Sequence, residues 1–533
     1  MPIPARSRVL SLAVLMAFST ACGSTVQGAG QAGGSVGQAG ADTTGSGPGA
    51  GLEVPGAGVG AGSTNGTGTT PAVGGSTAGG GGFGSGPTMG GSGSGGGRPG
   101  STGGAPGSRP GGGGTSGSGG TTGAGGSAPV GPGVTATEIR LGIPYCTDCS
   151  SGNAAAGAVG EDTGDTRRYY NEALREVNSR GGVLGRKLVP VFHPVSVSTD
   201  IEQSRQQACE TFTKDNKVLA IFFQGETTYA CALKAGIIAT GASGTGPIYD
   251  RFPNLFAPAS IRLERLAENT VKAMVKAGWH KPEPKWPTGK IGIISWDNAE
   301  YRYAMDKGWL PTMRNAGLKP TDVRYVAVPQ NFDGIGDAQA AIANAVLRFN
   351  EQKIDHVFIS DGPAGVFTGA GLTLLFMQNA KSQRYYPRYG LNTNNVPDFD
   401  SHPQDQLVGM IAIDSSSTEP ANDEGITPNP QRERCLSLMR KAGLPVGQEQ
   451  SRAVALGACE IAWFAEAIIK NSRSTLLADM IAGGESLGTS YRSPNTYGTK
   501  IGPGLRDGSR LFRNLQFDEE CECLRYTSKA YEP

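Results

Sequence analysis

Residues 23–133 constrain this chain most, because almost nothing in them can be built into a folded core. They contain 47 of the 84 glycines and only four charged residues, which are Asp42, Glu53, Arg98 and Arg109. So little apolar surface cannot offset the entropy lost when the backbone is ordered. We therefore expect residues 23–133 to form a disordered Gly/Ser-rich tether, with a mean end-to-end reach of roughly 60 Å.

The start of the sequence has the features of an export signal. Two arginines precede the apolar run Val9 to Phe18, which is too short to span a bilayer. The small residues before Cys22 resemble a bacterial lipobox, although Ser19 stands where lipoboxes usually carry Leu, Val or Ile. We expect residues 1–22 to be a lipoprotein signal peptide and Cys22 to be lipidated. The alternative is an ordinary signal peptide cleaved near Ala21.

Either form of this signal predicts an exported protein. A lipid on Cys22 would anchor the chain to the outer face of the cell membrane, at the cell surface or in the periplasm. The membrane would then be contacted through the lipid anchor only, because no apolar run in residues 134–533 approaches the roughly 20 residues of a membrane span.

Residues 134–533 have the composition of an ordinary globular protein, with 37 Gly, 43 Lys+Arg and 44 Asp+Glu. Their length suggests about two domains. The net charge of the whole chain is +1, which gives no reason to expect nucleic acid as a partner. Composition therefore favours a two-domain exported protein.

Strand and helix patterns alternate through this globular part. A continuous apolar run typical of a strand buried on both faces occurs at 218–223, and further strands are expected at 291–296 and 356–360. Apolar residues recur at helical spacing between them, as in 338–350 and 365–379. Two successive series of this kind predict an α/β fold with two doubly wound, Rossmann-like lobes. Ligands of such sheets bind outside the carboxyl ends of the strands, which here means the cleft between the lobes.

Four short segments carry a family resemblance. They are TEIRLG at 137–142, YYNE at 169–172, VNSRGGVLGRKL at 177–188 and WDNAEY at 296–301. Together they resemble the type I periplasmic binding proteins of ABC transporters, in particular those for the branched-chain amino acids Leu, Ile and Val. The segments match an opening strand, a first helix with its glycine turn, and an acidic loop of the second lobe. The resemblance covers essentially all of 134–533.

The resemblance implies two lobes joined by three crossovers. Lobe one would comprise 134–258 plus 391–505, and lobe two 259–390 plus 506–533. A protein of this family is a monomer without a cofactor, which closes on a small polar ligand such as an amino acid or related amide or acid. It then delivers the ligand to an ABC permease.

The resemblance also places ligand contacts in the loops at the strand ends. Tyr301 matches a family tyrosine that closes over the ligand, and the loop of Ser243 matches one that holds the ligand carboxylate. Where the family presents a hydroxyl, this chain has Glu226, so the ligand chemistry differs. The expected ligand-binding residues are Tyr145, Thr147, Gln224, Glu226, Thr227, Ala242, Ser243, Tyr301, Asp361 and Asn392.

Each of these residues also has a purely structural interpretation. A tyrosine at the start of a helix is often a core aromatic, and Ser243 in a glycine-rich turn often only caps it. Asp148, Glu226 and Asp361 can equally be solvated loop charges or helix caps. The sequence does not identify which acidic residue would bind the ammonium group of a ligand. Amides, ureas and aromatic acids therefore remain possible ligands in addition to amino acids.

Eight cysteines follow Cys22, and an even number in an exported chain favours disulfides. Cys209 and Cys231 are expected on helices that flank one strand and could meet, and Cys435 and Cys459 are expected on two consecutive helices. The remaining pairs, 146/149 and 521/523, are close in sequence, and we interpret 146/149 as a local link. A redox CxxC at 146–149 and a zinc site are the alternatives. The expected disulfide cysteines are Cys146, Cys149, Cys209, Cys231, Cys435, Cys459, Cys521 and Cys523, with their connectivity open.

Enzyme motifs are absent from residues 134–533, which contain no HExxH, Walker A or GxSxG pattern. The four histidines have no metal-binding spacing, and we expect them at the surface. We therefore predict a binding protein with neither catalytic residues nor a metal. The alternative to a transport receptor is a sensory or cell-surface module of the same fold that is not coupled to transport.

Overall fold

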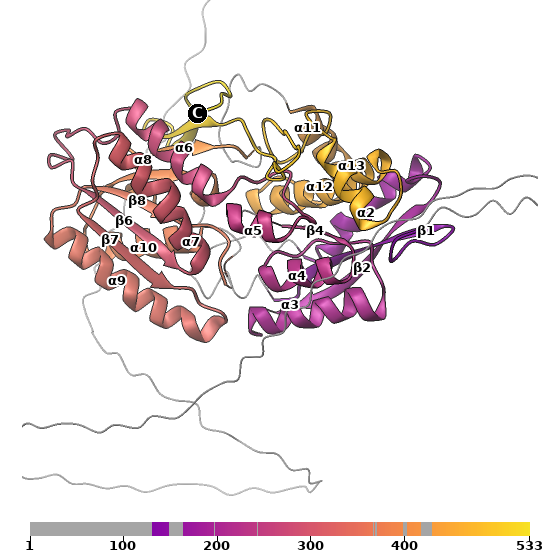
Figure 1. Ribbon diagram of the computed structural model, residues 1–533. Coiled ribbons are helices and arrows are strands. Elements are labelled where there is room, and N and C mark those ends of the chain that lie inside the picture. The colour runs from indigo at the N-terminus through magenta and orange to yellow at the C-terminus, as the bar shows by residue number, and fades with distance from the viewer. Residues whose placement is uncertain are drawn as a thin grey trace, which may run out of the picture. The chain divides into compact units, whose positions relative to one another are not determined.

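The computed structural model describes residues 130–148, 164–196, 198–241, 244–365, 367, 370–397, 402–416 and 429–533. The predicted signal peptide with Cys22, nearly all of the predicted tether, and Ala242, Ser243 and Cys149 lie outside these ranges. Residues 117–533 form one compact unit. This unit contains two β-sheets, each with its own helices (Figure 1).

The first sheet has five parallel strands in the order β2-β1-β3-β4-β5. Its crossover helices include a continuous pair, in which α3 runs directly into a short π-helix at 211–215. The strands are β1 Glu138–Cys146, β2 Lys187–Val195, β3 Ala220–Ile221, β4 Ile238–Thr240 and β5 Leu255–Phe256, and the helices are α2 Arg167–Ser179, α3 Ile201–Glu210, α4 Glu226–Lys234 and α5 Gly246–Arg251.

The second sheet has seven strands in the order β12-β11-β10-β9-β8-β6-β7. Five are parallel, and the last two in the sequence pair antiparallel at one edge. The strands are β6 Ile291–Asp297, β7 Asp322–Ala327, β8 His356–Ser360, β9 Arg388–Asn392, β10 Ile411–Asp414, β11 Arg513–Asp518 and β12 Cys523–Tyr526.

Amphipathic helices cover the second sheet and bury large aromatic side chains against it. Trp279 packs on Phe358 of β8 with ring centroids 4.3 Å apart, and Phe349 and Phe376 fill the other side of the core. The helices are α6 Leu263–Lys276, α7 Ala299–Ala304, α8 Leu310–Asn315, α9 Ile335–Glu351 and α10 Gly371–Ser382.

Three further helices return the chain to the first sheet. They are α11 Pro430–Lys441, α12 Glu449–Asn471 and α13 Leu477–Glu485, and their apolar side chains share one core with β1 and α2. Lobe one is therefore built from two separate segments of sequence. The chain passes between the lobes after β5, after β10 and after α13, which confirms the expected three crossovers.

The predicted lobe boundary at residue 391 is wrong. β9 and β10 lie in the second sheet, so the chain returns to lobe one only after Asp414. The alternation of strands and helices does not reveal the error, because a buried strand has the same apolar pattern in either sheet.

The crossovers meet in a hydrogen-bonded hinge. Gly508 donates its backbone N–H to Ala257 O at 2.9 Å. Asp507 between these segments is fully buried, and its carboxylate accepts from the backbone N–H of Arg262 at 3.0 Å and pairs with Arg265 at 2.5 Å. A buried carboxylate held by arginines is stable only while every partner stays in place.

Two local predictions are also wrong. The helix expected from residue 365 begins at Gly371, because Gly365 has a φ of +57° and a side chain there would overlap Pro329 O. The histidines are not all at the surface, since His356 and His402 are buried. His356 lies in β8, where its ring contacts Trp279 at 5.0 Å between centroids.

Disulfides link neighbouring helices in lobe one and close a turn in lobe two. Cys209–Cys231 joins α3 to α4, and Cys435–Cys459 joins α11 to α12, each with Cα atoms 6.1 Å apart. Cys521–Cys523 lies in the turn between β11 and β12. Cys146 is also disulfide-bonded. Within the described ranges, no helix combines the length and the apolar character needed to cross a bilayer.

Candidate functional site

A cavity of about 330 Å³ lies between the two lobes, and we call it the cleft cavity. Its walls come from the loops that follow β3, β6, β7 and β8, together with one side of α3. These are carboxyl ends of parallel strands, where ligands of such sheets are expected. The lining residues are Glu202, Arg205, Gln224, Gly225, Glu226, Thr227, Tyr229, Asn298, Glu300, Val328, Gln330, Pro363, Ala364 and Gly365.

The loop between β3 and α4 is held tightly against α3. Arg205 donates from Nε to Gln224 O at 2.8 Å, and its guanidinium also pairs with Glu202. Gly225 has a φ of +122°, and a side chain there would overlap the anchored Arg205. Only glycine combines this backbone conformation with such a close approach. The loop is therefore presented to the cleft in one conformation.

Charged groups face the cleft cavity from both lobes. In lobe one, Glu226 pairs with Arg251 at 2.6 Å, and Thr227 Oγ1 donates to Glu202 at 2.6 Å. In lobe two, burial and, to a smaller extent, the negative charge of Glu226 together raise the pKa of Glu300 to about 7. Because Glu300 then titrates near neutral pH, the cleft can accept either charged or neutral polar ligand groups.

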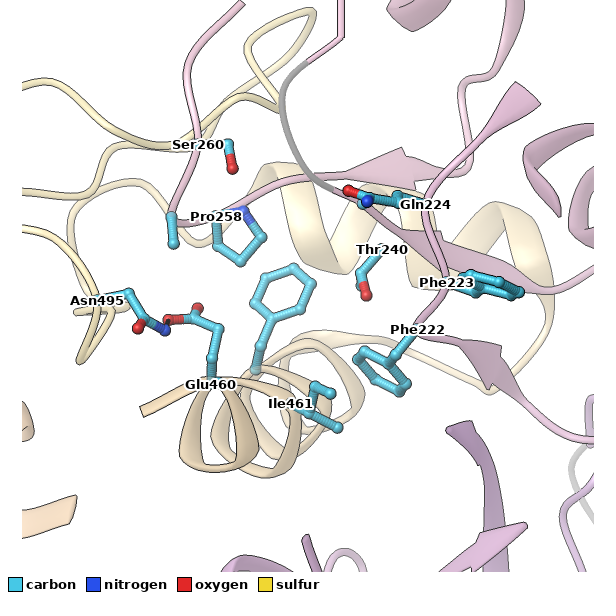
Figure 2. A pocket seen from close by; sticks show the side chains of 13 residues that line it. Phe222, Phe223, Gln224, Thr240, Pro258, Ser260, Glu460, Ile461 and Asn495 are labelled. Atoms are coloured by element: carbon cyan, nitrogen blue, oxygen red, sulfur yellow. Dashed lines mark hydrogen bonds between the residues drawn. The ribbon is translucent and has the colours of Figure 1, made fainter. Parts of the chain in front are cut away.

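A second cavity of about 360 Å³ opens within lobe one, and we call it the lobe-one cavity (Figure 2). It lies among the ends of β3 and β4, the hinge segment 258–260 and α12. Gln224 lines both cavities, so the two adjoin. The lining residues are Phe222, Phe223, Gln224, Thr240, Gly241, Pro258, Ala259, Ser260, Gly457, Glu460, Ile461, Phe464 and Asn495.

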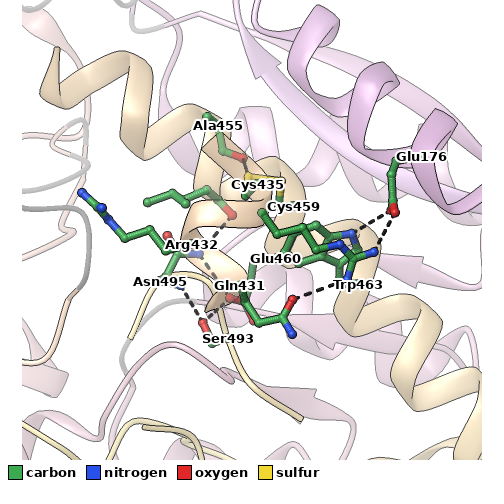
Figure 3. Close-up of a disulfide and its surroundings, with 12 residues drawn as sticks. Glu176, Gln431, Arg432, Cys435, Ala455, Cys459, Glu460, Trp463, Ser493 and Asn495 are labelled. Carbon is green, nitrogen blue, oxygen red and sulfur yellow. Dashed lines mark hydrogen bonds and ion pairs between the residues drawn. A yellow bond between two sulfur atoms is a disulfide. The ribbon is translucent and has the colours of Figure 1, made fainter. Parts of the chain in front are cut away.

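Glu460 is the acidic group of the lobe-one cavity. Its carboxylate accepts from Tyr491 Oη at 2.7 Å, from Asn495 Nδ2 at 3.2 Å and from Ser493 Oγ. Burial nevertheless raises the pKa of Glu460 above its usual range. Figure 3 shows how the preceding residue, Cys459, joins α12 to α11 through the disulfide, which fixes the helical turn that carries Glu460.

The structure brings three of the sequence-predicted residues together at the cleft cavity, namely Gln224, Glu226 and Thr227. Two others lie outside both cavities. The ring of Tyr145 is covered by the guanidinium of Arg167 at 4.5 Å, and Thr147 hydrogen-bonds Val195 O at the end of β2. Ala242 and Ser243 lie outside the described residues.

Tyr301, Asp361 and Asn392 lie buried behind the strand ends of lobe two. The Asp361 carboxylate accepts from Trp296 Nε1 at 2.8 Å and from the backbone and hydroxyl of Thr373 at 2.8 Å each. Burial raises its pKa to about 6 despite these donors. Asn392 caps the short helix that follows it by accepting from Asn394 N at 3.1 Å. In this structure the three residues support the loops that border the cleft.

Sequence reasoning missed Arg205, Glu300 and Glu460. Glu300 lies in the acidic segment 296–301, but the residue predicted there as a ligand contact was the neighbouring Tyr301. Arg205 faces the cleft only because α3 packs beside the loop after β3. Glu460 comes from α12, far along the chain, and no local pattern shows that this helix lies over the ends of β3 and β4. Among the described residues, no group of His, Cys, Asp and Glu is arranged to hold a metal ion.

Comparison with known proteins identifies the fold. No protein-family model matches the chain, and no curated protein matches it by sequence. A solute-binding protein of an ABC transporter from R. palustris, in complex with 4-hydroxybenzoate, is similar over 74% of this chain and 97% of its own, with 14% identity and a TM-score of 0.55.

Two further solved structures agree. A fatty acid ABC transporter substrate-binding protein from Thermomonospora curvata covers 76% of this chain and 95% of its own, at 15% identity and a TM-score of 0.54. A branched chain amino acid ABC transporter protein from Thermus thermophilus with bound valine covers 74% and 97%, at 13% identity and a TM-score of 0.52. The chain thus has the two-lobed fold of type I periplasmic binding proteins.

Proposed function

We propose that this chain is an extracytoplasmic solute-binding receptor that closes on a small polar ligand and delivers it to an ABC importer. The observation that supports this most directly is the cleft cavity, which takes its walls from strand-end loops of both lobes. A ligand bound there contacts both lobes at once only when they are closed. It therefore binds the closed state more tightly and shifts the population toward it.

The hinge between the lobes suits such a movement. The crossovers at 257–262 and 506–509 are hydrogen-bonded to each other beside the buried Asp507, so the lobes can turn about one compact region while their cores stay intact. The ion pair between Asp507 and Arg265 holds these hinge segments together. Closure then requires changes in a few backbone angles only.

The ligand in this proposal is a small polar molecule, such as an amino acid, a related amide or an aromatic acid. Gln224, Glu226 and Thr227 offer an amide, a carboxylate and a hydroxyl from lobe one, and Arg205 adds a cation. Glu300 faces them from lobe two. The solved structures of similar fold with bound valine and 4-hydroxybenzoate support this choice of ligand class.

The partner in this proposal is the permease of an ABC importer, and the receptor acts as a non-enzymatic monomer. We also propose that Cys22 carries the lipid anchor and that residues 23–133 tether the folded unit to the membrane. The proposed tether is long enough to let the cleft turn toward a permease in the same membrane.

The test is ligand-induced closure of the purified folded region. Binding of amino acids, amides and aromatic acids is measured by calorimetry, and closure by the change in radius of gyration in small-angle X-ray scattering. We expect at least one organic acid to bind with micromolar or tighter affinity and to reduce the radius of gyration. Absence of closure with every ligand that binds would contradict a receptor of this kind.

Two matched variants locate the site. Glu226→Gln should change the affinity for the bound ligand at least tenfold, because it removes a negative charge from the cleft cavity and releases Arg251 from its ion pair. Glu210→Gln removes a comparable ion pair with Lys214 on the exposed side of α3 and should leave affinity unchanged. Equal affinities for both variants would place the ligand elsewhere.

A further inference from the structure

We propose that the lobe-one cavity receives the apolar body of the ligand and that Glu460 accepts a hydrogen bond from a hydroxyl group at its far end. This inference rests on the proposed function and narrows its ligand to a hydroxylated apolar acid. It adds a specificity-determining residue on α12, a helix that is remote in sequence from every loop expected to bind the ligand.

The walls of the cavity fit an apolar ring or branched chain. Phe464 and Pro258 are buried at its wall, and Phe222 and Ile461 are partly exposed toward it. The volume is about 360 Å³, whereas an apolar cavity of about 150 Å³ already holds benzene. A phenyl-sized group therefore fits with space for a substituent.

Glu460 has room for one more hydrogen-bond donor. The side chains of Ser493 and Asn495 donate to its Oε2, the hydroxyl of Tyr491 donates to its Oε1, and the backbone of Asn495 also interacts with the carboxylate. A carboxylate oxygen can accept two hydrogen bonds. A pure hydrocarbon in the cavity would displace water from this oxygen. The oxygen would then lack a hydrogen bond that water can donate, which is unfavourable. A ligand hydroxyl would supply the missing donor.

The charges around the cavity set the orientation of the ligand. No Lys, Arg or His is among the described residues that line it, so a ligand carboxylate would meet Glu460 without a compensating cation. Arg205, which lines the cleft cavity beside Glu202, Glu226 and Glu300, is the only Lys, Arg or His among the described residues that line either cavity. The acid group of the ligand therefore faces the cleft and its hydroxyl faces Glu460.

Glu460 is held firmly enough to select a ligand. It follows Cys459, whose disulfide joins α12 to α11. Asn495, which donates to Glu460, is itself fixed by a hydrogen bond from Nδ2 to Leu456 O at 3.2 Å. Figure 2 shows the carboxylate of Glu460 beside Asn495 at the wall of the cavity. An acceptor in a fixed position discriminates between ligands with and without a matching donor.

The experiment uses two pairs of probes that differ by one hydroxyl. Binding of p-cresol and toluene is compared by ligand-observed NMR, and binding of 4-hydroxybenzoate and benzoate by calorimetry. We expect the hydroxylated member of each pair to bind at least tenfold more tightly. Equal binding within each pair overturns the inference, whatever the variants do.

Variants on α12 assign the preference to one side chain. Glu460→Gln, which is nearly isosteric, should reduce the preference to less than threefold. Glu466→Gln is the control, because Glu466 lies on the same helix and pairs instead with Arg180 and Lys470. The preference should persist in this control, and its persistence in Glu460→Gln would overturn the inference.

The closure measurement separates this inference from the proposed function. If organic acids close the lobes but neither their hydroxyl nor Glu460 affects affinity, the inference fails and the receptor function stands. If p-cresol binds with the expected dependence on Glu460 but no acid closes the lobes, the receptor function fails. The lobe-one cavity is then a hydroxyl-selective site of another kind.

Discussion

Replacing both Cys435 and Cys459 by alanine removes the covalent link between α11 and α12, and we expect it to destabilise lobe one strongly. The two cysteines are 24 residues apart in sequence and both are fully buried. A cross-link of this span restricts the unfolded chain by about 3.5 kcal/mol at 25 °C in the chain-entropy model. Truncating the two buried side chains adds a loss on the order of 1 kcal/mol.

The turn disulfide Cys521–Cys523 provides the matched control. It closes a loop with a sequence separation of 2, for which the same model gives only about 1.5 kcal/mol. Cys521 is exposed, so truncating its side chain leaves no buried cavity. The paired alanine variants should therefore differ by about 3 kcal/mol in their free energies of unfolding.

Thermal unfolding followed by circular dichroism measures this difference. For a lobe of roughly 150–250 residues, 1 kcal/mol corresponds to about 2–4 °C, so a loss of about 4.5 kcal/mol lowers the Tm by about 9–18 °C. Loss of the turn disulfide should lower it by no more than about 6 °C. If both double variants shift the Tm equally, the explanation from loop length and burial is refuted.

Three further predictions concern the hinge, the cleft loop and pH. Asp507→Asn should lower the free energy of unfolding by about 3–5 kcal/mol in urea denaturation, because it removes the carboxylate that pairs with the partly buried Arg265 and the buried Arg510; a loss below 1 kcal/mol would contradict this reasoning. Gly225→Ala should destabilise the fold by about 1–3 kcal/mol and weaken ligand binding, since alanine is strained at a φ of +122°; unchanged Tm and affinity would show that the loop relaxes. The pKa of Asp361 is raised from 3.8 to about 6, so between these pH values the folded state binds more protons than the unfolded state. Its contribution to stability is therefore largest at low pH and falls by up to about 3 kcal/mol as the pH rises through this window, and urea titrations at pH 4 to 7 should show this slope flattened in Asp361→Asn.

Much of the fold is predictable because the relevant patterns are local. The strand predicted at 356–360 is β8 with the same bounds, and the strand predicted at 291–296 is β6, which is one residue longer. Each of these segments needs burial on both faces, which only a central parallel strand provides. The alternation of such strands with amphipathic helices then leaves two doubly wound sheets as the natural solution.

The candidate site was only partly predictable. Gln224, Glu226 and Thr227 follow a strand directly, so their position at the carboxyl edge of the sheet follows from topology. Asp361 also follows a strand, yet its carboxylate turns inward to four donors on Trp296, Gly362 and Thr373. The sequence pattern is the same in both cases. It does not show the direction in which a strand-end side chain turns, because that direction depends on the hydrogen-bond donors that neighbouring residues supply.

The sequence by itself determined the α/β class, because periodicity acts over short stretches, and four short segments carried the likeness to two-lobed binding proteins. The tether at residues 23–133 stays a prediction from composition. Only the tertiary structure decided that β9 and β10 join the second sheet, that Cys435 pairs with Cys459, and that α12 carries Glu460 to the ends of β3 and β4. Each of these depends on packing between segments far apart in the chain. That packing is governed by shape and by the pairing of buried polar groups, and neither is written in a local pattern.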